Sequence, residues 1–247
     1  MSYENEFAGL TAIVTGAGSG IGLATAQLLQ NRGATVIGFD LQEGEMAGVA
    51  QWVKCDVGDK DSVAQAFLNI SNLDILINNA GIGASGSIEN AEDEEWLRVL
   101  NINVVGIART SKSALPLLRK STSGTIVNTC SVAATAGIPN RAIYSASKGA
   151  VLSLTMAMAN DFLKDGIRVN CVNPGTADTP WVGRILAQSN SPVEERKALE
   201  ARQPMGRLVT AAEIAQAICY LASPLQGSTT ATSLAVDGGM QGLRVPR

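Results

Sequence analysis

The sequence predicts a doubly wound α/β fold with a parallel sheet, and three observations support this prediction. Short β-rich segments alternate with longer segments of helical periodicity along all 247 residues. The β-rich segments are mostly continuous apolar runs, which is typical of strands covered by helices on both faces. Neither a low-complexity linker nor an internal repeat divides the chain, so we expect a single domain over residues 1–247.

The individual elements follow from these patterns in chain order. The expected strands are Leu10–Thr15, Ala34–Asp40, Gln51–Val57, Leu73–Asn78, Thr125–Cys130, Ile167–Val172 and Ser233–Val236. The expected helices are Ile21–Gln30, Asp59–Ile70, a long region from about Glu92 to Arg119, Tyr144–Leu163 and Thr210–Ala222.

The irregular exception is Thr176–Arg207, which contains Pro180, Pro192 and Pro204. Only Val193–Arg202 has helical spacing within it. A segment this long between a strand and a helix is often a functional loop. We therefore expect a substrate lid at about residues 176–207.

Composition and charge exclude several classes of function. The chain is 46% hydrophobic and 17% charged, which is ordinary for a globular protein. Its net charge of −3 and its pI near 5.1 argue against nucleic-acid or membrane-surface binding. The start, MSYENEFAGL, lacks the basic and apolar regions of a signal peptide, and no apolar run approaches the length of a membrane span. We expect a cytoplasmic protein without nucleic-acid or membrane partners.

The residue types available for chemistry are restricted, because the chain contains no histidine. This excludes the Ser-His-Asp and Cys-His constellations. The cysteines are Cys55, Cys130, Cys171 and Cys219, which are widely spaced and form no CxxC pair. We expect them to be buried and reduced, and we expect no metal site. Acid–base chemistry must then come from Tyr, Lys, Asp, Glu or Cys.

A glycine loop, TGAGSGIG at Thr15–Gly22, follows the first strand and opens a helix. Such a loop lets backbone N–H groups approach a pyrophosphate at the positive end of the helix. In a strand–loop–helix–strand unit this predicts a dinucleotide site. The loop residues expected to contact the cofactor are Gly16, Ser19, Gly20 and Ile21.

Asp40 ends the second strand, 24 residues after Gly16. A carboxylate there can accept hydrogen bonds from ribose hydroxyls and would repel a 2′-phosphate. Neither the loop nor the next residue, Leu41, supplies the arginine or lysine that NADP usually needs. We therefore predict NAD, with Asp40 and Leu41 in its site, although an ordinary turn aspartate is the alternative.

Two further strand ends carry polar residues where ligands bind in such sheets. Asp56 and Val57 end the third expected strand, and Asp56 is expected at the adenine. Asn78-Asn79-Ala80-Gly81 ends the fourth strand. Asn79, Ala80 and Gly81 are expected at the cofactor, with the asparagines mainly satisfying backbone groups.

The stretch YSASKG places Tyr144 and Lys148 four residues apart, on one face of the expected helix. Tyrosine and lysine both titrate near pH 10 in water, so neither is a good proton carrier alone. A cation held beside a phenol favours the phenolate. The pair is therefore a candidate acid–base device. The alternative is a packed tyrosine ring and a solvated lysine.

Together with these motifs, a serine thirteen residues before YSASK and an NPG after the sixth strand complete a pattern that resembles the short-chain dehydrogenase/reductase family over nearly the whole chain. The resemblance implies a Rossmann fold with a mostly parallel seven-stranded sheet and oxidation at a CH–OH group. It also implies a homotetramer built through the helices that carry Asn103 and Tyr144 and through the last strand. The tail Gly242–Arg247 would reach a neighbouring subunit.

The resemblance also implies a catalytic tetrad of Asn103, Ser131, Tyr144 and Lys148. Tyr144 would take the hydroxyl proton, Lys148 would stabilise the phenolate, and Ser131 would hold the substrate oxygen. Asn103, preferred over its neighbour Asn101, would hold a water that links Lys148 to solvent. Cys130 replaces the first of two serines that relatives commonly carry, which leaves Ser131 in place. A loop that closes over the nicotinamide is implied at Pro174, Gly175, Ala177 and Thr179.

Arginines flank the expected site of an acidic protein, and arginine is the preferred fork for a carboxylate. They predict an anionic substrate, with the lid tryptophan suiting a small polar acid. The residues expected at the substrate are Arg141, Trp181, Arg184 and Arg202. Alternatively, Arg184 and Arg202 are solvated or paired with Glu194, Glu195 and Glu200.

The motifs TADTP and RQPMGR are similar to those of the family's branch that acts on small hydroxy acids. That branch includes dehydrogenases for 2-keto-3-deoxy sugar acids of the L-fuconate or L-rhamnonate type, which we favour, and cytosolic 3-hydroxybutyrate dehydrogenases. The alternatives are a 3-oxoacyl-thioester reductase using NADPH, against which Asp40 argues, and a non-catalytic dinucleotide-binding regulator.

Overall fold

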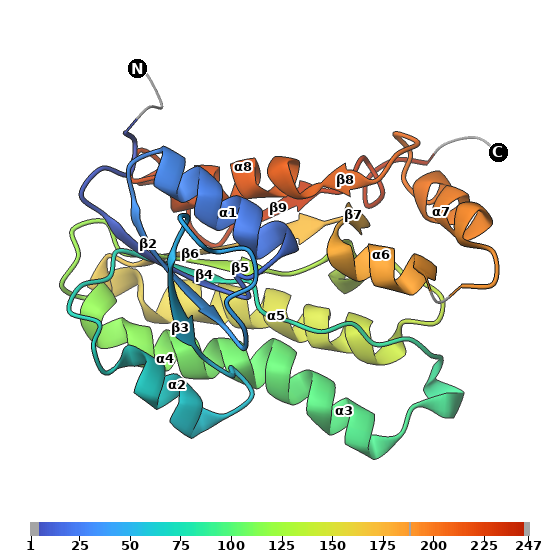
Figure 1. Cartoon of the computed structure of the whole chain (residues 1–247), viewed down its shortest axis with the longest axis horizontal. Coiled ribbons are helices and arrows are strands. Elements are labelled where there is room, and N and C mark those ends of the chain that lie inside the picture. The colour runs from blue at the N-terminus through green and yellow to red at the C-terminus, as the bar shows by residue number, and fades with distance from the viewer. Residues whose placement is uncertain (1–4, 188, 245–247) are drawn as a thin grey trace.

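The computed structural model describes residues 5–187 and 189–244, and the last residues of the tail, 245–247, lie outside this range. Seven parallel strands form one sheet in the order β3-β2-β1-β4-β5-β6-β9 (Figure 1). The strands are β1 (Thr11–Thr15), β2 (Thr35–Asp40), β3 (Gln51–Lys54), β4 (Ile75–Asn78), β5 (Thr125–Thr129), β6 (Arg168–Pro174) and β9 (Ser233–Val236). The predicted fold is confirmed, and the sheet is parallel throughout.

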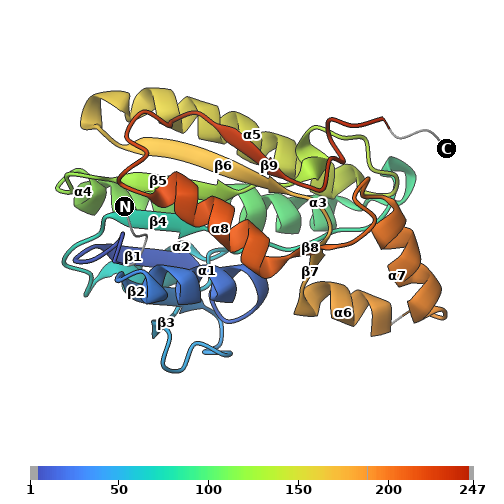
Figure 2. The same ribbon diagram turned by 90° about the horizontal axis from the view of Figure 1, so that it is seen from above.

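Helices cover both faces of this sheet (Figures 1 and 2). One face is covered by α1 (Gly20–Asn31) and α8 (Ala211–Ala222). The other face is covered by α2 (Lys60–Phe67), α4 (Gly106–Leu118) and α5 (Ala142–Asp161). Short 3-10 turns are η1 (Ile88–Asn90), η3 (Val132–Ala134) and η4 (Leu163–Asp165). No helix within the described residues is long and apolar enough to cross a membrane.

The third strand is shorter than the sequence predicts, ending at Lys54 instead of Val57. It is the edge strand, and β2, its neighbour in the sheet, ends at Asp40 opposite Lys54. The last ladder contact between them is Cys55 N–H donating to Asp40 O at 3.0 Å, and the chain then leaves the sheet. Asp56 and Val57 therefore lie in a turn after the strand, with Gly58 N–H donating to Asp56 Oδ1 at 2.8 Å.

The predicted helix over Glu92–Arg119 is interrupted by a widened turn. It consists of α3 (Asp93–Leu100), a π-helical turn η2 (Asn101–Val105), and α4. Arg109 supports this turn, with Nη2 donating to Asn101 Oδ1 at 2.8 Å and Nη1 donating to Val57 O at 3.1 Å. Because π-turns add a residue to the helical repeat and are frequent at functional sites, the position of Asn103 depends on this interruption.

The expected lid is more ordered than predicted. It contains β7 (Ala177–Asp178), which pairs with β8 (Val209–Thr210), and two helices, α6 (Pro180–Ala187) and α7 (Pro192–Ala201). The sequence predicted α7 but not α6. The helices share a small apolar cluster of Val182, Leu199 and Leu208, separate from the two large clusters beside the sheet. The lid projects beyond one end of the sheet (Figure 2).

The strand order reverses between β1 and β4, which are neighbours although they are not consecutive in sequence. In open parallel sheets, ligands bind at the carboxyl ends of the strands beside such a reversal. The glycine loop follows β1 there, and Asn79-Ala80-Gly81 follows β4. The fold therefore brings together two motifs that are more than sixty residues apart, as the hydrogen bonds between Thr15 and Asn79 show.

Candidate active site

A cavity of about 450 Å³ opens at the carboxyl end of the sheet and beneath the lid. This volume is within the usual range for small-molecule sites. The cavity is lined by every residue predicted to bind the cofactor: Gly16, Ser19, Gly20, Ile21, Asp40, Leu41, Asp56, Val57, Asn79, Ala80, Gly81, Tyr144, Lys148, Pro174, Gly175, Ala177 and Thr179. The four residues predicted at the substrate, Arg141, Trp181, Arg184 and Arg202, line the same cavity.

The glycine loop has the close backbone approaches that a phosphate cradle needs. Gly16 has φ +67°, and a Cβ there would lie 2.9 Å from Ala80 Cα. A Cβ on Gly22 would lie 2.0 Å from Gly16 O. Ser19, at the N-cap of α1, makes no side-chain cap bond. The helix N-terminus is therefore available to an anion, and the loop fits a pyrophosphate.

Asp40 fits the ribose end of a dinucleotide. Its Oδ2 accepts a hydrogen bond from Gly18 N–H at 2.9 Å, which fixes the carboxylate against the glycine loop. Within the described residues, Oδ1 makes no hydrogen bond, so it remains available to a ribose hydroxyl. The loop that follows β4 is held by Thr15, whose Oγ1 accepts from Asn79 N–H at 2.9 Å and Ala80 N–H at 3.0 Å.

The two asparagines of the NNAG motif have different partners. Asn79 bonds the backbone as predicted, with Nδ2 donating to Thr15 O at 3.1 Å. Asn78 is buried among side chains instead: Thr110 Oγ1 donates to its Oδ1 at 2.7 Å, and its Nδ2 donates to Asn128 Oδ1 at 2.9 Å. Asn78 therefore joins α4 to the centre of the sheet.

Ser131, Tyr144 and Lys148 lie on the floor of the cavity. Ser131 caps η3, where its Oγ accepts from Ala133 N–H at 3.1 Å. Lys148 is only 5% exposed, its Nζ donates to Thr129 O at 2.8 Å, and it lies 5.7 Å from the centre of the Tyr144 ring. No described carboxylate pairs with Lys148, and the titratable side chains near its Nζ are Tyr144 and the thiols of Cys130 and Cys171. Lys148 is therefore buried beside Tyr144 and is not the solvated lysine of the alternative, while the acid–base role of the pair stays a prediction.

Asn103 does not line the cavity but buttresses it from behind. Its Oδ1 accepts from Ile82 N–H at 2.8 Å, and its Nδ2 donates to Ile82 O at 2.9 Å and Ser147 Oγ at 3.1 Å. Asn101 points elsewhere and donates to Gly58 O at 2.9 Å. The choice of Asn103 over Asn101 therefore agrees with the structure, because only Asn103 contacts the helix that carries Lys148. The water-holding role of Asn103 stays a prediction.

The arginines form the positive end of the cavity. Arg141 is half-buried, and its Nη1 donates to Ser85 Oγ. Burial lowers the pKa of Arg141, and the nearby Arg202 lowers it further, while Tyr144 and Glu195 oppose this shift. Neither Arg184 nor Arg202 forms an ion pair with any described residue, so the predicted pairing with Glu194, Glu195 and Glu200 is not seen. Both side chains are exposed, as the alternative of solvated arginines expects, although both line the cavity.

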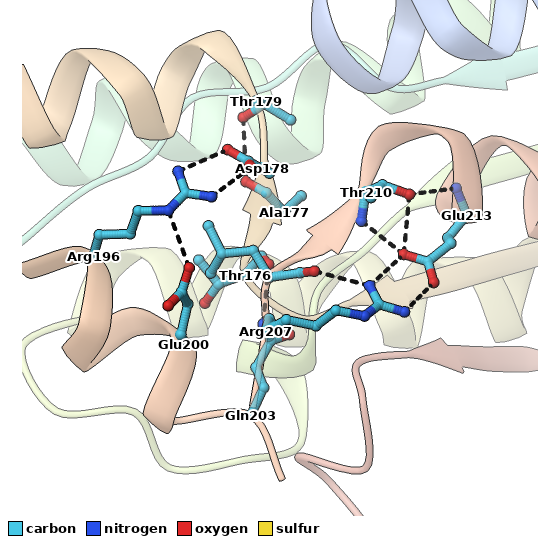
Figure 3. A network of polar contacts seen from close by, with 11 residues as sticks. Thr176, Ala177, Asp178, Thr179, Arg196, Glu200, Gln203, Arg207, Thr210 and Glu213 are labelled. Carbon is cyan, nitrogen blue, oxygen red and sulfur yellow. Dashed lines mark hydrogen bonds and ion pairs between the residues drawn. The ribbon is translucent and has the colours of Figure 1, made fainter. Parts of the chain in front are cut away.

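The lid is anchored by two other arginines (Figure 3). Arg196 on α7 forms a fork to Asp178 on β7, with Nη2 to Oδ2 at 2.7 Å, and its Nε donates to Glu200 at 3.0 Å. Arg207 pairs with Glu213 at the start of α8, with Nη2 to Oε1 at 2.6 Å. The Arg196–Asp178 contact holds α7, whose C-cap is Arg202, to the strand that carries Ala177.

Sequence reasoning missed several residues of the cavity wall: Ile82, Gly83, Ile138, Glu195, Leu199 and Met240. Glu195, Leu199 and Arg202 could have been found together, because their i, i+4, i+7 spacing places them on one helix face. Ile82 and Gly83 directly follow the NNAG motif, and no local pattern marks them as wall residues.

The cysteines are free and buried, as predicted. Cys55 lies at the adenine end of the cavity, where burial and the charges of Asp56 and Asp40 raise its pKa to about 12. Its thiol is therefore protonated and unreactive at neutral pH. Among the described residues, no group of acidic or cysteine side chains is arranged to hold a metal ion.

These features define a dinucleotide-binding protein with a tyrosine–lysine pair at the end of its cofactor cleft. Residues 16–241 match the family described as enoyl-(acyl carrier protein) reductase. The chain belongs to the short-chain dehydrogenase/reductase family. It is an oxidoreductase that acts on CH–OH groups and uses a nicotinamide dinucleotide cofactor.

Relatives of this chain are similar over almost their whole length. The cis-4-hydroxycyclohexanecarboxylate dehydrogenase of Sinomonas cyclohexanicum is 41% identical, with 94% of this chain and 97% of the relative covered. A dehydrogenase/reductase of Rattus norvegicus, SDR family member 6, is 37% identical over the same shares. The ligand-free structure of Thermoplasma acidophilum aldohexose dehydrogenase is 32% identical, with a TM-score of 0.90 over 99% of this chain and 100% of that chain.

Proposed function

We propose that the protein oxidises a secondary hydroxyl of a small hydroxy carboxylate with NAD. The observation that carries this proposal is the pair Arg141 and Arg202, close enough in one cavity with Tyr144 for Arg202 to lower the pKa of Arg141. Two neighbouring cations without ion-pair partners among the described residues repel each other, and a bound carboxylate relieves that repulsion. Glu195 offsets the positive charge only in part, because three arginines line the same cavity.

Bound NAD supplies the hydride acceptor, and the protein supplies the proton path. Tyr144, as phenolate, takes the proton from the substrate hydroxyl, and the Lys148 ammonium stabilises the phenolate charge. The Ser131 hydroxyl donates to the substrate oxygen and orients it. Asn103 keeps the wall behind Lys148 in place through Ile82 and Ser147.

The preference for NAD over NADP rests on the ribose end of the cavity. The Asp40 carboxylate lies where a 2′-phosphate would have to fit, and Oδ1 is available to ribose hydroxyls. No lysine or arginine is found among the described residues around Asp40 that line this end, from Gly16 to Ile21 and at Leu41. This arrangement argues against an NADPH-dependent thioester reductase.

Within this substrate class we place 2-keto-3-deoxy sugar acids first and 3-hydroxybutyrate second, on the similarity of the lid motifs. The relative from Sinomonas cyclohexanicum, named for a hydroxycyclohexane carboxylate, supports the broader class of hydroxy acids. We also propose a cytoplasmic homotetramer. The partly exposed Val105 on η2 and Met156 on α5 support association through these helices, which sedimentation or light scattering would test.

The decisive experiment is reduction of NAD, and separately NADP, against a panel of hydroxy acids, uncharged sugars and neutral secondary alcohols. We expect turnover of acids with NAD. Arg141→Gln should lower kcat/KM for the acid by about tenfold to a hundredfold, because a charge-assisted hydrogen bond contributes about 1.5–3 kcal/mol. The same variant should leave kcat/KM for a slowly oxidised neutral alcohol unchanged. Equal losses on acid and neutral alcohol would overturn the carboxylate site.

A further inference from the structure

Gly83 has no backbone reason to be glycine. It follows the NNAG motif, one residue after Ile82, and its φ lies outside the left-handed region. In this respect it differs from Gly16 and Gly20, whose positive φ values favour glycine. The requirement for glycine at position 83 must therefore come from space rather than from the backbone conformation.

The space next to Gly83 is filled by the indole of Trp181. A Cβ on Gly83 would lie 2.3 Å from Trp181 Cζ2, 3.0 Å from Cη2 and 3.1 Å from Cε2. No side chain tolerates such a distance, so the six-membered part of the indole rests directly on the Gly83 backbone. Trp181 belongs to lid helix α6, and Gly83 to the loop after β4. Both residues line the cavity.

The same loop also holds the arginine of the proposed carboxylate site. Ser85 accepts a hydrogen bond from Arg141 Nη1, Gly86 N–H donates to Asn140 O at 3.1 Å, and Ala142 N–H donates to Gly86 O at 3.2 Å. Residues 82–86 therefore contact Trp181 at one end and Arg141 at the other. The distance from the aromatic wall to the arginine is set by this one short segment.

We propose that the Gly83–Trp181 contact determines substrate size in this enzyme. With glycine at 83, the indole packs directly against the wall and leaves a compact space between Trp181, Tyr144 and Arg141 for a small hydroxy acid. Any larger residue at 83 pushes the indole and the lid outward and enlarges that space. This inference rests on the proposed function for the identity of the acid, but the contact itself does not depend on it.

The lid makes this hypothesis testable without unfolding the protein. Trp181 is 43% exposed, so its indole can move outward when Gly83→Ala is introduced. Gly183 provides a matched control, because it lies on α6 two residues from Trp181 and a Cβ there would meet nothing within 4 Å. Gly183→Ala therefore adds the same methyl group to the same lid without touching the wall.

The kinetic test measures both variants on the acid that the wild type oxidises best, or on its best secondary alcohol if no acid is oxidised. Gly83→Ala should raise the substrate KM about tenfold, a smaller effect than the ~100-fold loss of rate that a 1 Å misplacement of the substrate can cause. The kcat and the KM for NAD should be nearly unchanged. Bulkier homologues should lose less. In a Trp181→Leu background, Gly83→Ala should have little further effect, because the clashing ring is gone. Equal losses in both backgrounds would overturn the proposal.

A second measurement separates failure of the contact from failure of the proposed substrate class. The protein has three tryptophans, and labelling with 5-fluorotryptophan gives each a fluorine resonance, with that of Trp181 assigned from Trp181→Phe. Gly83→Ala should shift the Trp181 resonance, and Gly183→Ala should shift it less. An unmoved Trp181 resonance in Gly83→Ala refutes the contact, whatever the substrate is. A shifted resonance without turnover of any acid supports the contact and refutes only the hydroxy-acid assignment.

Discussion

Arg168 is a buried cation without a carboxylate partner among the described residues, and its replacement by methionine should lower the free energy of unfolding substantially. It begins β6, is 8% exposed, and burial lowers its pKa. Its Nη1 donates to Leu221 O at 2.8 Å and Thr229 O at 3.1 Å, and its Nη2 donates to Ser223 O at 2.9 Å. Leu221 and Ser223 lie at the C-terminal end of α8, where a helix leaves its last carbonyls without partners, and Thr229 lies in the loop that follows.

The expected magnitude follows from these bonds. In Arg168→Met, the new side chain replaces the apolar stem of the arginine but leaves the buried carbonyls unpaired. Each unsatisfied group costs about 1–3 kcal/mol. The variant also avoids the free-energy cost of burying the guanidinium, so the net loss is smaller than the sum of these penalties. We expect a loss of about 3–5 kcal/mol in the free energy of unfolding. That is a large share of the roughly 5–15 kcal/mol that stabilises a typical domain.

The assay is urea unfolding followed by circular dichroism at one fixed protein concentration, so that any self-association contributes equally to all variants. Arg119→Met is the matched control. Arg119 pairs with Asp165 at 2.8 Å, but the two side chains are 50% and 30% exposed. An exposed pair of this kind contributes below about 1 kcal/mol. If Arg168→Met costs no more than Arg119→Met, the reasoning about the buried guanidinium is wrong.

Two further predictions concern the cofactor and the lid anchor. Asp40→Ser should shift the ratio of kcat/KM for NAD over NADP towards NADP by about tenfold to a hundredfold, because one charge-assisted hydrogen bond is lost and the repulsion of a 2′-phosphate is removed. The control is Asp61→Asn, which removes the same charge outside the cavity. An unchanged ratio in Asp40→Ser would contradict the assignment of Asp40 to the ribose. Glu213→Gln should destabilise the protein by up to about 1 kcal/mol at neutral pH, the usual range of an exposed ion pair, because Gln can keep the capping box with Thr210 but not the charge that pairs with Arg207. The ion pair with Arg207 and the bonds from Thr210 lower the pKa of Glu213 to about 2 from its ordinary 4.5. A carboxylate with a lowered pKa stabilises the fold above pH 4.5, and this contribution is lost as the pH falls towards 2. Urea unfolding should therefore show the free energies of unfolding of the variant and the wild type converging below about pH 3. A difference that persists there would contradict the role of the charge.

The cofactor site could be predicted from the sequence because its signals are local. The loop at Thr15–Gly22 fixes its own conformation through glycines, and Asp40 and Asn79 each follow a strand whose apolar pattern is unambiguous. Parallel strands place their carboxyl ends at one edge, so these segments had to converge. All seventeen cofactor residues named from sequence line one cavity for this reason.

The lid was less predictable, since its order comes from tertiary contacts. Pro180 and Gly183 weaken the helical signal of α6, and the helix is held by packing of Val182 against Leu199 and Leu208. The π-turn at Asn101–Val105 also escaped prediction. A periodicity of 3.6 residues does not reveal a single widened turn, and Arg109 stabilises this one from the following helix.

The sequence by itself determined the parallel α/β fold, the dinucleotide loop and the tyrosine–lysine pair, because each depends on residues close together in the chain. Only the tertiary structure decided that Arg141 and Arg202 are neighbours in one cavity, that Asn103 stands behind Lys148, and that Trp181 rests on Gly83. Such contacts join segments far apart in the chain, and packing of the whole lid against the sheet fixes them. No local pattern of residue types encodes the distances between such segments. The shape of the substrate space is therefore visible only in the folded protein.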